Sequence, residues 1–409
     1  MTRTYDVVVI GAGAAGLMCA GTAARRGKSV LCLEKMPRPG RKLMITGKGR
    51  CNLTNNCTQD EFISAVRHNG RFLYSAYTAL DAQALMAFFE DRGVRLKTER
   101  GRRVFPASDR SADIVDALMR YASDGGVRIE TMPCESLLVT ETRVTGVHTA
   151  QGDIEAQSVV VATGGKSYPL TGSTGDGYDF ARAAGHTVTD LRPSLIPVVT
   201  EEKWCGDLMG LSLKNVTLSL YHREKKKPVF SELGEMLFTH FGLSGPLALS
   251  ASAHMEGPLS AYLFKLDLKP GLTHEQLDAR ILRDFAQNSN RSLMNTLGAL
   301  LPRKMVPVII RLTGIDGDIK VHQVTKEQRL ELVSLLKALE ITPRAFRPIE
   351  EAVITSGGVK VSEVDPKTMG SKIKDGLYFA GEVLDVDAYT GGYNLQIAFS
   401  TGYLAGLSI

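Results

Sequence analysis

The sequence predicts an α/β protein in which one nucleotide-binding domain is interrupted by an insert. Three observations support this prediction. A βαβ pattern with a glycine-rich turn occupies the first 34 residues, and strand patterns suited to the same sheet recur near residues 160 and 380. The residues between about 191 and 345 follow a different pattern, and a chain of 409 residues is too long for one ordinary core.

The first element is a short β-branched run, YDVVVI, that is typical of a buried parallel strand. It leads directly into GAGAAG at residues 11–16. Residues 14–26 are good helix formers, Gly27 ends that helix, and residues 29–33 form a second strand that closes on Glu34. Because strand, turn, helix, strand and acid fall in register, we interpret the segment as an adenine-dinucleotide site.

Each glycine of the turn has a physical role. Gly11 makes the tight turn, Gly13 lets the backbone approach a pyrophosphate, and Gly16 lets helix and strand pack closely. The pyrophosphate is expected at the helix N-terminus, beside Ala14 and Ala15. Glu34, followed by Lys35, is placed to accept hydrogen bonds from the ribose, which favours FAD or NAD over NADP.

Two later strands complete the predicted site. SVVVA at residues 158–162 is a buried-strand pattern that follows a predicted hairpin and ends in TGG, and LYFA at 377–380 is a last short strand. Glu382 or Asp385 is expected to hold a ribityl chain, and the helix opening at residues 392–396 to stabilise a reduced flavin through its dipole. The site is therefore sized for FAD, and its further predicted contacts are Thr163, Gly164, Gly165, Gly381, Gly392, Asn394, Leu395 and Gln396.

The loop GRKLMITGKGRCNLTNNC lies where flavin disulfide reductases carry a cysteine pair. Its two cysteines are spaced CxxxxxC, one residue longer than the CxxxxC of those enzymes, and no C-terminal His-Pro motif follows. We therefore interpret the loop as a second wall of the flavin site, with Cys51 packed beneath it. The expected contacts come from glycines that allow close approach and from polar and basic side chains: Arg41, Lys42, Thr46, Gly47 and Asn52.

Composition limits the function classes. With 44% hydrophobic and 23% charged residues the chain is typical of a globular protein. The net charge of +5 is mild and the basic residues look scattered along the sequence, so no nucleic-acid partner is expected. Six cysteines without a CxxC pair give no metal pattern, and no apolar run approaches the roughly 20 residues of a membrane span. We expect a cytoplasmic protein.

The whole chain resembles the BaiN-like family of bacterial FAD-dependent oxidoreductases, also labelled aminoacetone-oxidase-like flavoproteins. The matching segments run from one end to the other: GAGAAG with Glu34, PGRKLMITGKGRCNLTN, ATGG, TGSTGDGY, PSLIPV, GEMLFTHFGLSGP and GEVLDVDAYTGGYNLQIA. The TGDG turn and the last strand are more distantly similar to fumarate reductase and aspartate oxidase flavoproteins.

The resemblance implies a glutathione-reductase-like FAD-binding Rossmann domain with an insert. The predicted domains are residues 1–190 and 346–409 for FAD, and 191–345 for the insert. Within the insert, we expect a β-rich, barrel-like part at about 191–270 and 318–345 and a helical part at about 271–317. Thr273 and Thr325 are expected to cap helices.

The resemblance also implies an activity. We expect NAD(P)H-dependent reduction of an activated carbon–carbon double bond, with a 3-oxo bile acid or similar enone as substrate. Since only one GxGxxG unit occurs, NADH or NADPH is expected to dock transiently. Two alternatives remain open: a flavin amine oxidase that makes imine and peroxide, and a non-catalytic flavin sensor or RNA-associated protein. The chain is expected to be a monomer or a homodimer.

Three side chains are candidates for proton transfer. His240, in GEMLFTHFGLSGP, is expected to point into the cleft and polarise a carbonyl. Tyr393 and Asp387 lie in the C-terminal flavin loop as proton donor or orienting group. Tyr168 and Arg192 are weaker candidates. Flavin chemistry needs few side chains, because the cofactor carries out the hydride transfer.

Overall fold

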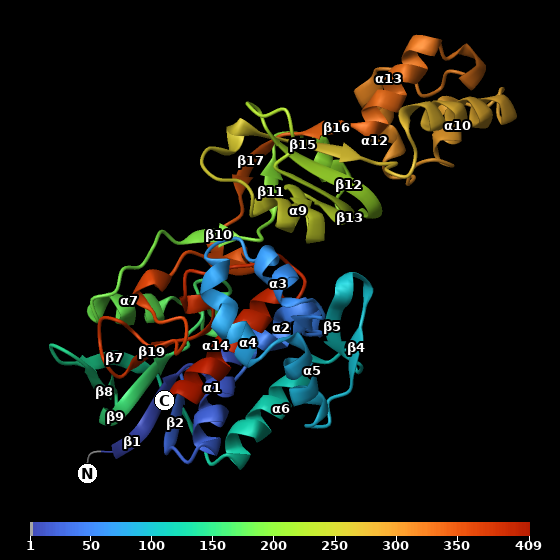
Figure 1. Ribbon diagram of the computed structural model, residues 1–409. Coiled ribbons are helices and arrows are strands. Elements are labelled where there is room, and N and C mark those ends of the chain that lie inside the picture. The colour runs from blue at the N-terminus through green and yellow to red at the C-terminus, as the bar shows by residue number, and fades with distance from the viewer. Residues whose placement is uncertain (1–2) are drawn as a thin grey trace. The chain divides into compact units, whose positions relative to one another are not determined.

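The computed structural model describes residues 3–409, which form two compact units (Figure 1). Unit 1 runs to Ser194 and resumes at Ile349, and unit 2 consists of Leu195–Pro348. The chain therefore leaves the first unit once and returns to it once, and the borders lie within a few residues of those expected after residues 190 and 345.

Unit 1 is built on a parallel sheet that continues into an antiparallel meander. The order is β6-β2-β1-β9-β8-β7, and β19 also pairs with β9. Val7, Val8 and Val9 of the first strand have no exposed surface, which explains the uninterrupted apolar run. The predicted βαβ unit and hairpin are confirmed. The strands are β1 (Arg3–Ile10), β2 (Val30–Glu34), β6 (Arg128–Thr131), β7 (Cys134–Val139), β8 (Val144–Thr149), β9 (Gly152–Val161) and β19 (Leu377–Phe379).

One long helix of unit 1, α1 (Ala14–Arg25), packs against two others, α6 (Ser111–Asp124) and α14 (Tyr393–Ser408). Small residues make this possible. A Cβ on Gly402 of α14 would stand 2.3 Å from the carbonyl oxygen of Ala15 on α1. The first and last helices of the unit therefore approach backbone to backbone, which brings the two ends of the chain together beside the sheet.

The rest of unit 1 surrounds this core. A small antiparallel sheet of order β3-β5-β4 stands at one edge of the unit, where Figure 1 shows β4 and β5 as an outlying hairpin. The remaining elements are α2 (Arg41–Ile45), β3 (Thr54–Asn55), α3 (Gln59–Ala65), α4 (Tyr74–Ala79), α5 (Ala82–Glu90), β4 (Leu96–Thr98), β5 (Arg103–Pro106), α7 (Asp176–Ala183), β10 (Arg192–Ser194) and β18 (Ile354–Ser356).

Unit 2 contains an antiparallel sheet of order β16-β15-β12-β13-β14-β11-β17. Its two outermost strands are consecutive in the chain and are separated by Thr342 alone, so the sheet curls back on itself as the barrel-like prediction requires. Helix α9 (Gly245–Ser252) packs on β13. The strands are β11 (Val198–Thr200), β12 (Ser212–His222), β13 (Phe230–Thr239), β14 (Gly242–Ser244), β15 (Tyr262–Asp267), β16 (Leu339–Ile341) and β17 (Pro343–Phe346).

The helical part of unit 2 contains α10 (His274–Gln287), α11 (Leu293–Leu297), α12 (Val306–Thr313) and α13 (Lys326–Lys337). Thr273 and Thr325 cap α10 and α13 through capping boxes, as predicted. The helical part extends to Lys337, beyond the expected limit near residue 317, because α13 packs on α10 and α12. The unit has its own apolar core around Phe238, Phe264 and Ile309.

Candidate functional site

The glycine turn after β1 has the geometry of an anion cradle. Gly11 has φ of 101°, and a Cβ there would lie 2.6 Å from the carbonyl oxygen of Ala162. A Cβ on Gly16 would lie 1.8 Å from the carbonyl oxygen of Gly11, whereas a Cβ on Gly13 would have no protein atom within 4 Å. The open space therefore lies beside Gly13, the glycine expected to let the backbone approach a pyrophosphate. Gly13 also begins α1 without a side-chain cap, which leaves amide groups of the first turn, where Ala14 and Ala15 lie, available to an anion.

Glu34 braces this turn. Its Oε2 accepts a hydrogen bond from the amide of Ala12 and its Oε1 one from the amide of Met36, both at 2.9 Å. The carboxylate therefore lies beside the glycine turn, at the end of β2. The neighbouring Lys35 is engaged elsewhere, because its Nζ lies 2.6 Å from Oδ2 of Asp176 and also contacts Thr174.

The second predicted wall is tied to the glycine turn through Gly40, whose amide donates to the carbonyl oxygen of Ala12 at 2.9 Å. From there Lys42 reaches the far end of the chain. Its Nζ donates to Oγ of Ser167 at 2.7 Å and to Oε2 of Glu382 at 2.5 Å. Arg41 is exposed, and Thr46 donates to the carbonyl oxygen of Leu43. Three distant segments thus meet at one point.

Three polar atoms of the site are buried without a hydrogen-bond partner in the described part of the chain. They are Oδ1 of Asn52 and Oδ1 of Asn55, in the second wall, and Oγ1 of Thr163, directly after β9. Gly47 has φ of 57° and is exposed to solvent. Buried polar groups are normally paired, so these atoms fit a site that a polar ligand completes.

The segments that follow β9 and β19 are rich in glycine because neighbouring atoms leave no room for a Cβ atom there. Gly164 and Gly381 have φ of 76° and 80°. A Cβ on Gly165 would lie 2.6 Å from Oε1 of Glu382. That carboxylate also accepts from the amide of Thr355 at 2.9 Å, so it serves as the centre of a network that the sequence did not reveal.

The C-terminal flavin loop is held by its own side chains. Asn394 accepts from the amide of Ala388 and donates to its carbonyl oxygen, both at 2.8 Å. Gln396 is buried and donates to the carbonyl oxygen of Leu80 at 2.8 Å. Gly392 has φ of 102° and starts α14 without a side-chain cap. Leu395 is partly buried against the core of the unit. The predicted contacts Asn394 and Gln396 therefore position this loop through bonds within the protein.

Asp385 and Asp387 differ in their surroundings. Burial raises the pKa of Asp385. Asp387 is 1% exposed, and its two oxygens accept hydrogen bonds from Oγ of Ser194 at 2.8 Å and of Ser356 at 2.9 Å. The carboxylate of Asp387 therefore joins β10 to β18.

The remaining proton-transfer candidates lie in both units. Tyr393 occupies the first turn of α14 in unit 1, with its ring centroid 6.4 Å from that of Phe62. His240 belongs to unit 2, where it is exposed at the turn between β13 and β14, edge-on to Phe241. Tyr168 has φ of 54° in unit 1, and Arg192 is exposed near Asp190.

The loop cysteines are poorly suited to thiol chemistry. Cys51 is fully buried, and burial raises its pKa to about 12. Burial also raises the pKa of Cys57. The reactive species is the thiolate, which such groups do not form near neutral pH. Cys51 lies packed beneath the loop, as the sequence suggested.

Asn55 is the residue that sequence reasoning undervalued. Its Nδ2 donates to the carbonyl oxygen of Gly101 at 2.9 Å and to that of Gly391 at 3.1 Å. It thereby links the β4–β5 hairpin to the C-terminal flavin loop. The sequence signal for this contact is weak, because an asparagine in a turn-rich loop is expected to bond its own backbone.

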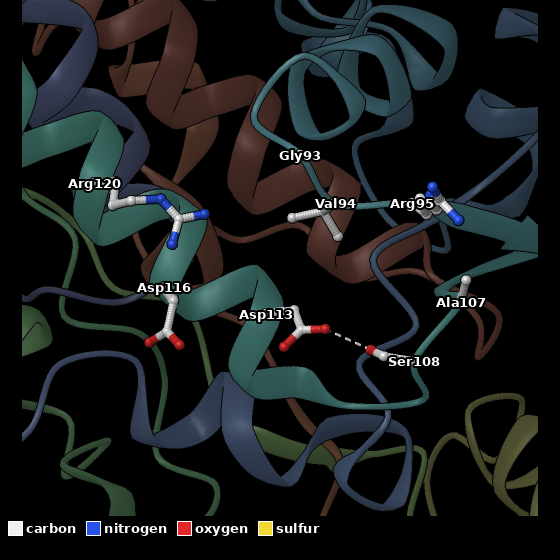
Figure 2. A pocket seen from close by; sticks show the side chains of 8 residues that line it. All are labelled: Gly93, Val94, Arg95, Ala107, Ser108, Asp113, Asp116 and Arg120. Atoms are coloured by element: carbon white, nitrogen blue, oxygen red, sulfur yellow. Dashed lines mark hydrogen bonds between the residues drawn. The ribbon is translucent and has the colours of Figure 1, made fainter.

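A hollow of about 330 Å³ lies elsewhere on unit 1, near the start of α6. Figure 2 shows that its charged side chains are two arginines, Arg95 and Arg120, and two aspartates, Asp113 and Asp116. Asp113 accepts a hydrogen bond from Ser108 at 2.5 Å. The residues of the predicted flavin site do not line this hollow.

Within residues 3–409, no helix combines the length and the apolar composition needed to cross a membrane.

The architecture resembles that of a solved steroid dehydrogenase. A 3-ketosteroid-Δ4-(5α)-dehydrogenase from Rhodococcus jostii superimposes with a TM-score of 0.53 over 99% of this chain and 96% of that one, at 16% identity. The similarity supports the predicted fold class, a Rossmann-like FAD domain with an insert. The open cradle at Gly13 and the unpaired atoms of Asn52 and Thr163 fit FAD as the cofactor.

Relatives match along the full chain. The ribosomal RNA dihydrouridine synthase of Haemophilus influenzae is 32% identical, over 100% of this chain and 99% of its own. The enzyme of the same name from Escherichia coli is 30% identical, over 98% and 96%. The 3-dehydro-bile acid delta(4,6)-reductase of Clostridium scindens is 29% identical, over 97% of each chain. The expectation of no nucleic-acid partner stays untested, since two of these relatives are named for ribosomal RNA.

The predicted resemblance and the prediction of a flavin-dependent oxidoreductase are thus confirmed. The family model described as the HI0933-like protein Rossmann domain matches residues 5–408, and the chain belongs to that family.

Proposed function

We propose that this flavoenzyme reduces a carbon–carbon double bond conjugated to a carbonyl group. FAD, held at the glycine turn after β1 and by the second wall, would supply the hydride-transfer chemistry, and a side chain of this protein would deliver the proton that is added to the other carbon of the double bond. The enzyme thus acts on a CH–CH bond, with NADH or NADPH as the source of the hydride.

The observation that carries the proposal is the chemistry common to the full-length relatives. A 3-dehydro bile acid with double bonds at positions 4 and 6 is a conjugated ketone. The uracil ring likewise contains a double bond, C5–C6, that is conjugated to a carbonyl group. Reduction of that bond gives dihydrouracil. The two substrates differ in size and charge, but they need the same electron transfer and the same proton.

The residues of unit 1 favour Tyr393 over Asp387 as the proton donor. Asp387 already accepts two hydroxyl hydrogen bonds and is 1% exposed, so its carboxylate is committed to joining two strands. Tyr393 is partly exposed on the first turn of α14, beside the C-terminal flavin loop. His240, which lies in unit 2, stays a prediction.

The hydride donor is proposed to bind transiently. The described residues contain one βαβ unit with a glycine turn, and the sheet of unit 2 is antiparallel. A nicotinamide therefore has no dinucleotide-binding domain of its own, and the oxidised nicotinamide would leave before the substrate enters. This order of events predicts ping-pong kinetics.

Anaerobic stopped-flow absorbance tests the proposal. The purified yellow protein is mixed with NADH, NADPH or a small primary amine, and the flavin band is followed. We expect a nicotinamide to bleach the flavin and a conjugated substrate, either a 4-en-3-one steroid or protein-free ribosomal RNA, to restore the colour. Bleaching by the amine with no response to either nicotinamide would contradict the proposal and favour an amine oxidase.

A further inference from the structure

One surface of unit 1 is strongly basic. Residues 92–110 contain seven Lys and Arg against two acidic residues, so this segment alone carries as much net positive charge as the whole chain. Residues 41–50 contain four basic residues and no acid. We call these two segments together the basic ridge.

The two segments of the basic ridge are neighbours in the fold. β3 follows the first segment and pairs with β5 of the second, with Thr54 opposite Val104 and Asn55 opposite Arg103. Arg50 reaches across to Glu99 and, at 2.6 Å, to Asp109. Strand pairing and the ion pairs of Arg50 therefore bring the two basic segments side by side, although they are far apart in the sequence.

The acids near the ridge are already neutralised. Glu99 and Asp109 bind Arg50 and Lys97, and these cations lower the pKa of both carboxyl groups. Glu61, on α3, likewise binds Arg102 at 2.7 Å. In the described chain no ion pair joins the other exposed cations of the ridge to an acid. They are Arg41, Lys48, Arg95, Arg100 and Arg110.

The ridge is continuous with the flavin site. Arg41 and Lys48 belong to the second wall itself. Asn55 connects the turn at Gly101, inside the arginine segment, to Gly391 of the C-terminal flavin loop. The hollow in Figure 2 lies at the Arg95 end, where Arg95 and Arg120 offset the charge of Asp113 and Asp116, so the excess positive charge lies on the other cations of the ridge.

We infer that the basic ridge binds the phosphate backbone of a single-stranded RNA segment whose uracil enters the flavin site. The inference rests on the proposed function and specifies its substrate class. Arginine is the side chain best suited to phosphate oxygens, and a steroid-like enone has no need of several exposed cations on two neighbouring segments. The strand is single-stranded because a base must leave its stack before its ring reaches an enzyme's active site.

The test measures binding and turnover separately. A fluorescent oligouridylate of about 20 nucleotides is titrated with the oxidised holoenzyme over a range of salt concentrations. The variant Arg95→Ala/Arg100→Ala/Arg110→Ala is compared with wild type. Its matched control is Arg26→Ala/Lys360→Ala/Lys367→Ala, which removes the same charge from exposed positions outside the ridge.

We expect the ridge variant to bind about 100-fold more weakly at about 0.1 M salt, with a log–log salt slope reduced by about 2, because each phosphate contact contributes about 0.7. The control variant is expected to bind like wild type, and replacing the same three arginines by lysine to keep most of the binding. Equal losses in the ridge and control variants, or no loss in either, would overturn the inference.

Folding and function are checked independently. Thermal melting and flavin content show whether the ridge variant is intact. Arg95→Gln/Arg100→Gln/Arg110→Gln, which removes the charge but keeps long side chains, answers the question if the alanine variant is unstable. If RNA binds through the ridge but does not reoxidise the reduced flavin, the result supports the docking surface and contradicts the proposed reaction. Binding of polyglutamate as tight as that of RNA would instead indicate an acidic protein partner and overturn the inference.

Discussion

Lys42 donates from Nζ to Oε2 of Glu382 at 2.5 Å, across 340 positions of the sequence. The two side chains are 24% and 13% exposed, so the ion pair is largely shielded from water. Ser167 shares both partners, accepting from Lys42 at 2.7 Å and donating to Glu382 at 3.1 Å. The contact joins the loop after β2, the turn after β9 and the segment after β19 at one corner of the predicted flavin site.

Replacing Lys42 by Met should weaken FAD binding about tenfold, or about 1.4 kcal/mol. The substitution leaves the half-buried carboxylate of Glu382 without its cation and loosens the three segments. Fluorescence titration of the apoprotein with FAD measures the change. Lys360→Met, at an exposed position of the same unit, is the control and should bind FAD like wild type. Equal affinities for the two variants would contradict the role given to Lys42.

The glycine turn offers a pair of substitutions with different outcomes. Gly13→Val should abolish FAD binding but change the stability of the apoprotein little, because no protein atom lies within 4 Å of the added Cβ. Gly16→Val should reduce both, since its Cβ would overlap the carbonyl oxygen of Gly11 at 1.8 Å. Apoprotein melting curves and flavin content of the purified variants distinguish these effects. A destabilised Gly13→Val apoprotein would show that the space beside Gly13 is needed by the protein itself.

Asp387 should prove to be a positioning residue. Asp387→Ala leaves the hydroxyl groups of Ser194 and Ser356 without their acceptor, which should lower the free energy of unfolding by about 1–3 kcal/mol. Asp387→Asn keeps one acceptor oxygen and should retain more of the stability. Urea unfolding of the apoprotein measures both. A large loss of kcat in Asp387→Asn with an unchanged pH profile fits positioning, whereas loss of one limb of that profile would indicate proton transfer.

Cys51→Ser should retain nicotinamide-dependent flavin reduction within about threefold of wild type. The thiol is buried and its pKa is raised to about 12, so it stays protonated and unreactive near neutral pH. Stopped-flow bleaching of the flavin measures the rate. A folded, flavin-loaded Cys51→Ser protein that no longer turns over would restore the thiol mechanism.

His186 should make unit 1 less stable in mild acid. Its side chain is fully buried against Phe379, and burial lowers its pKa below the usual 6.5, an effect that Glu363 at 3.4 Å opposes. As the pH falls below about 6.5, the unfolded chain binds a proton that the folded chain does not, so the free energy of unfolding falls.

Urea unfolding at about pH 7.5 and about pH 5.5 should show this loss, which is on the order of 1 kcal/mol for this residue. In His186→Gln the loss between the two pH values should be smaller, because the titrating group is absent. An identical pH dependence in both proteins would assign the acid sensitivity to other groups.

The local chemistry of the cofactor site was readable from the sequence. The strand, glycine turn, helix and acid of the first βαβ unit are determined by residues close together in the chain, and Glu34 accepts a hydrogen bond from the turn that contains Gly11. Capping residues such as Thr273 and Thr325 act within three residues of their targets. Patterns of this kind need no knowledge of the rest of the fold.

Tertiary structure decided the contacts between distant segments. The bond of Lys42 to Glu382, the bridge from Gly101 through Asn55 to Gly391, and the commitment of Asp387 to two serines all depend on which strands become neighbours. The basic ridge also depends on such a contact, since its two basic segments become neighbours only when β3 pairs with β5. By itself the sequence determined that the chain binds a dinucleotide, because that information is local. Which charges gather beside the site was decided by strand pairing, because side chains far apart in the chain interact only after the sheets have formed.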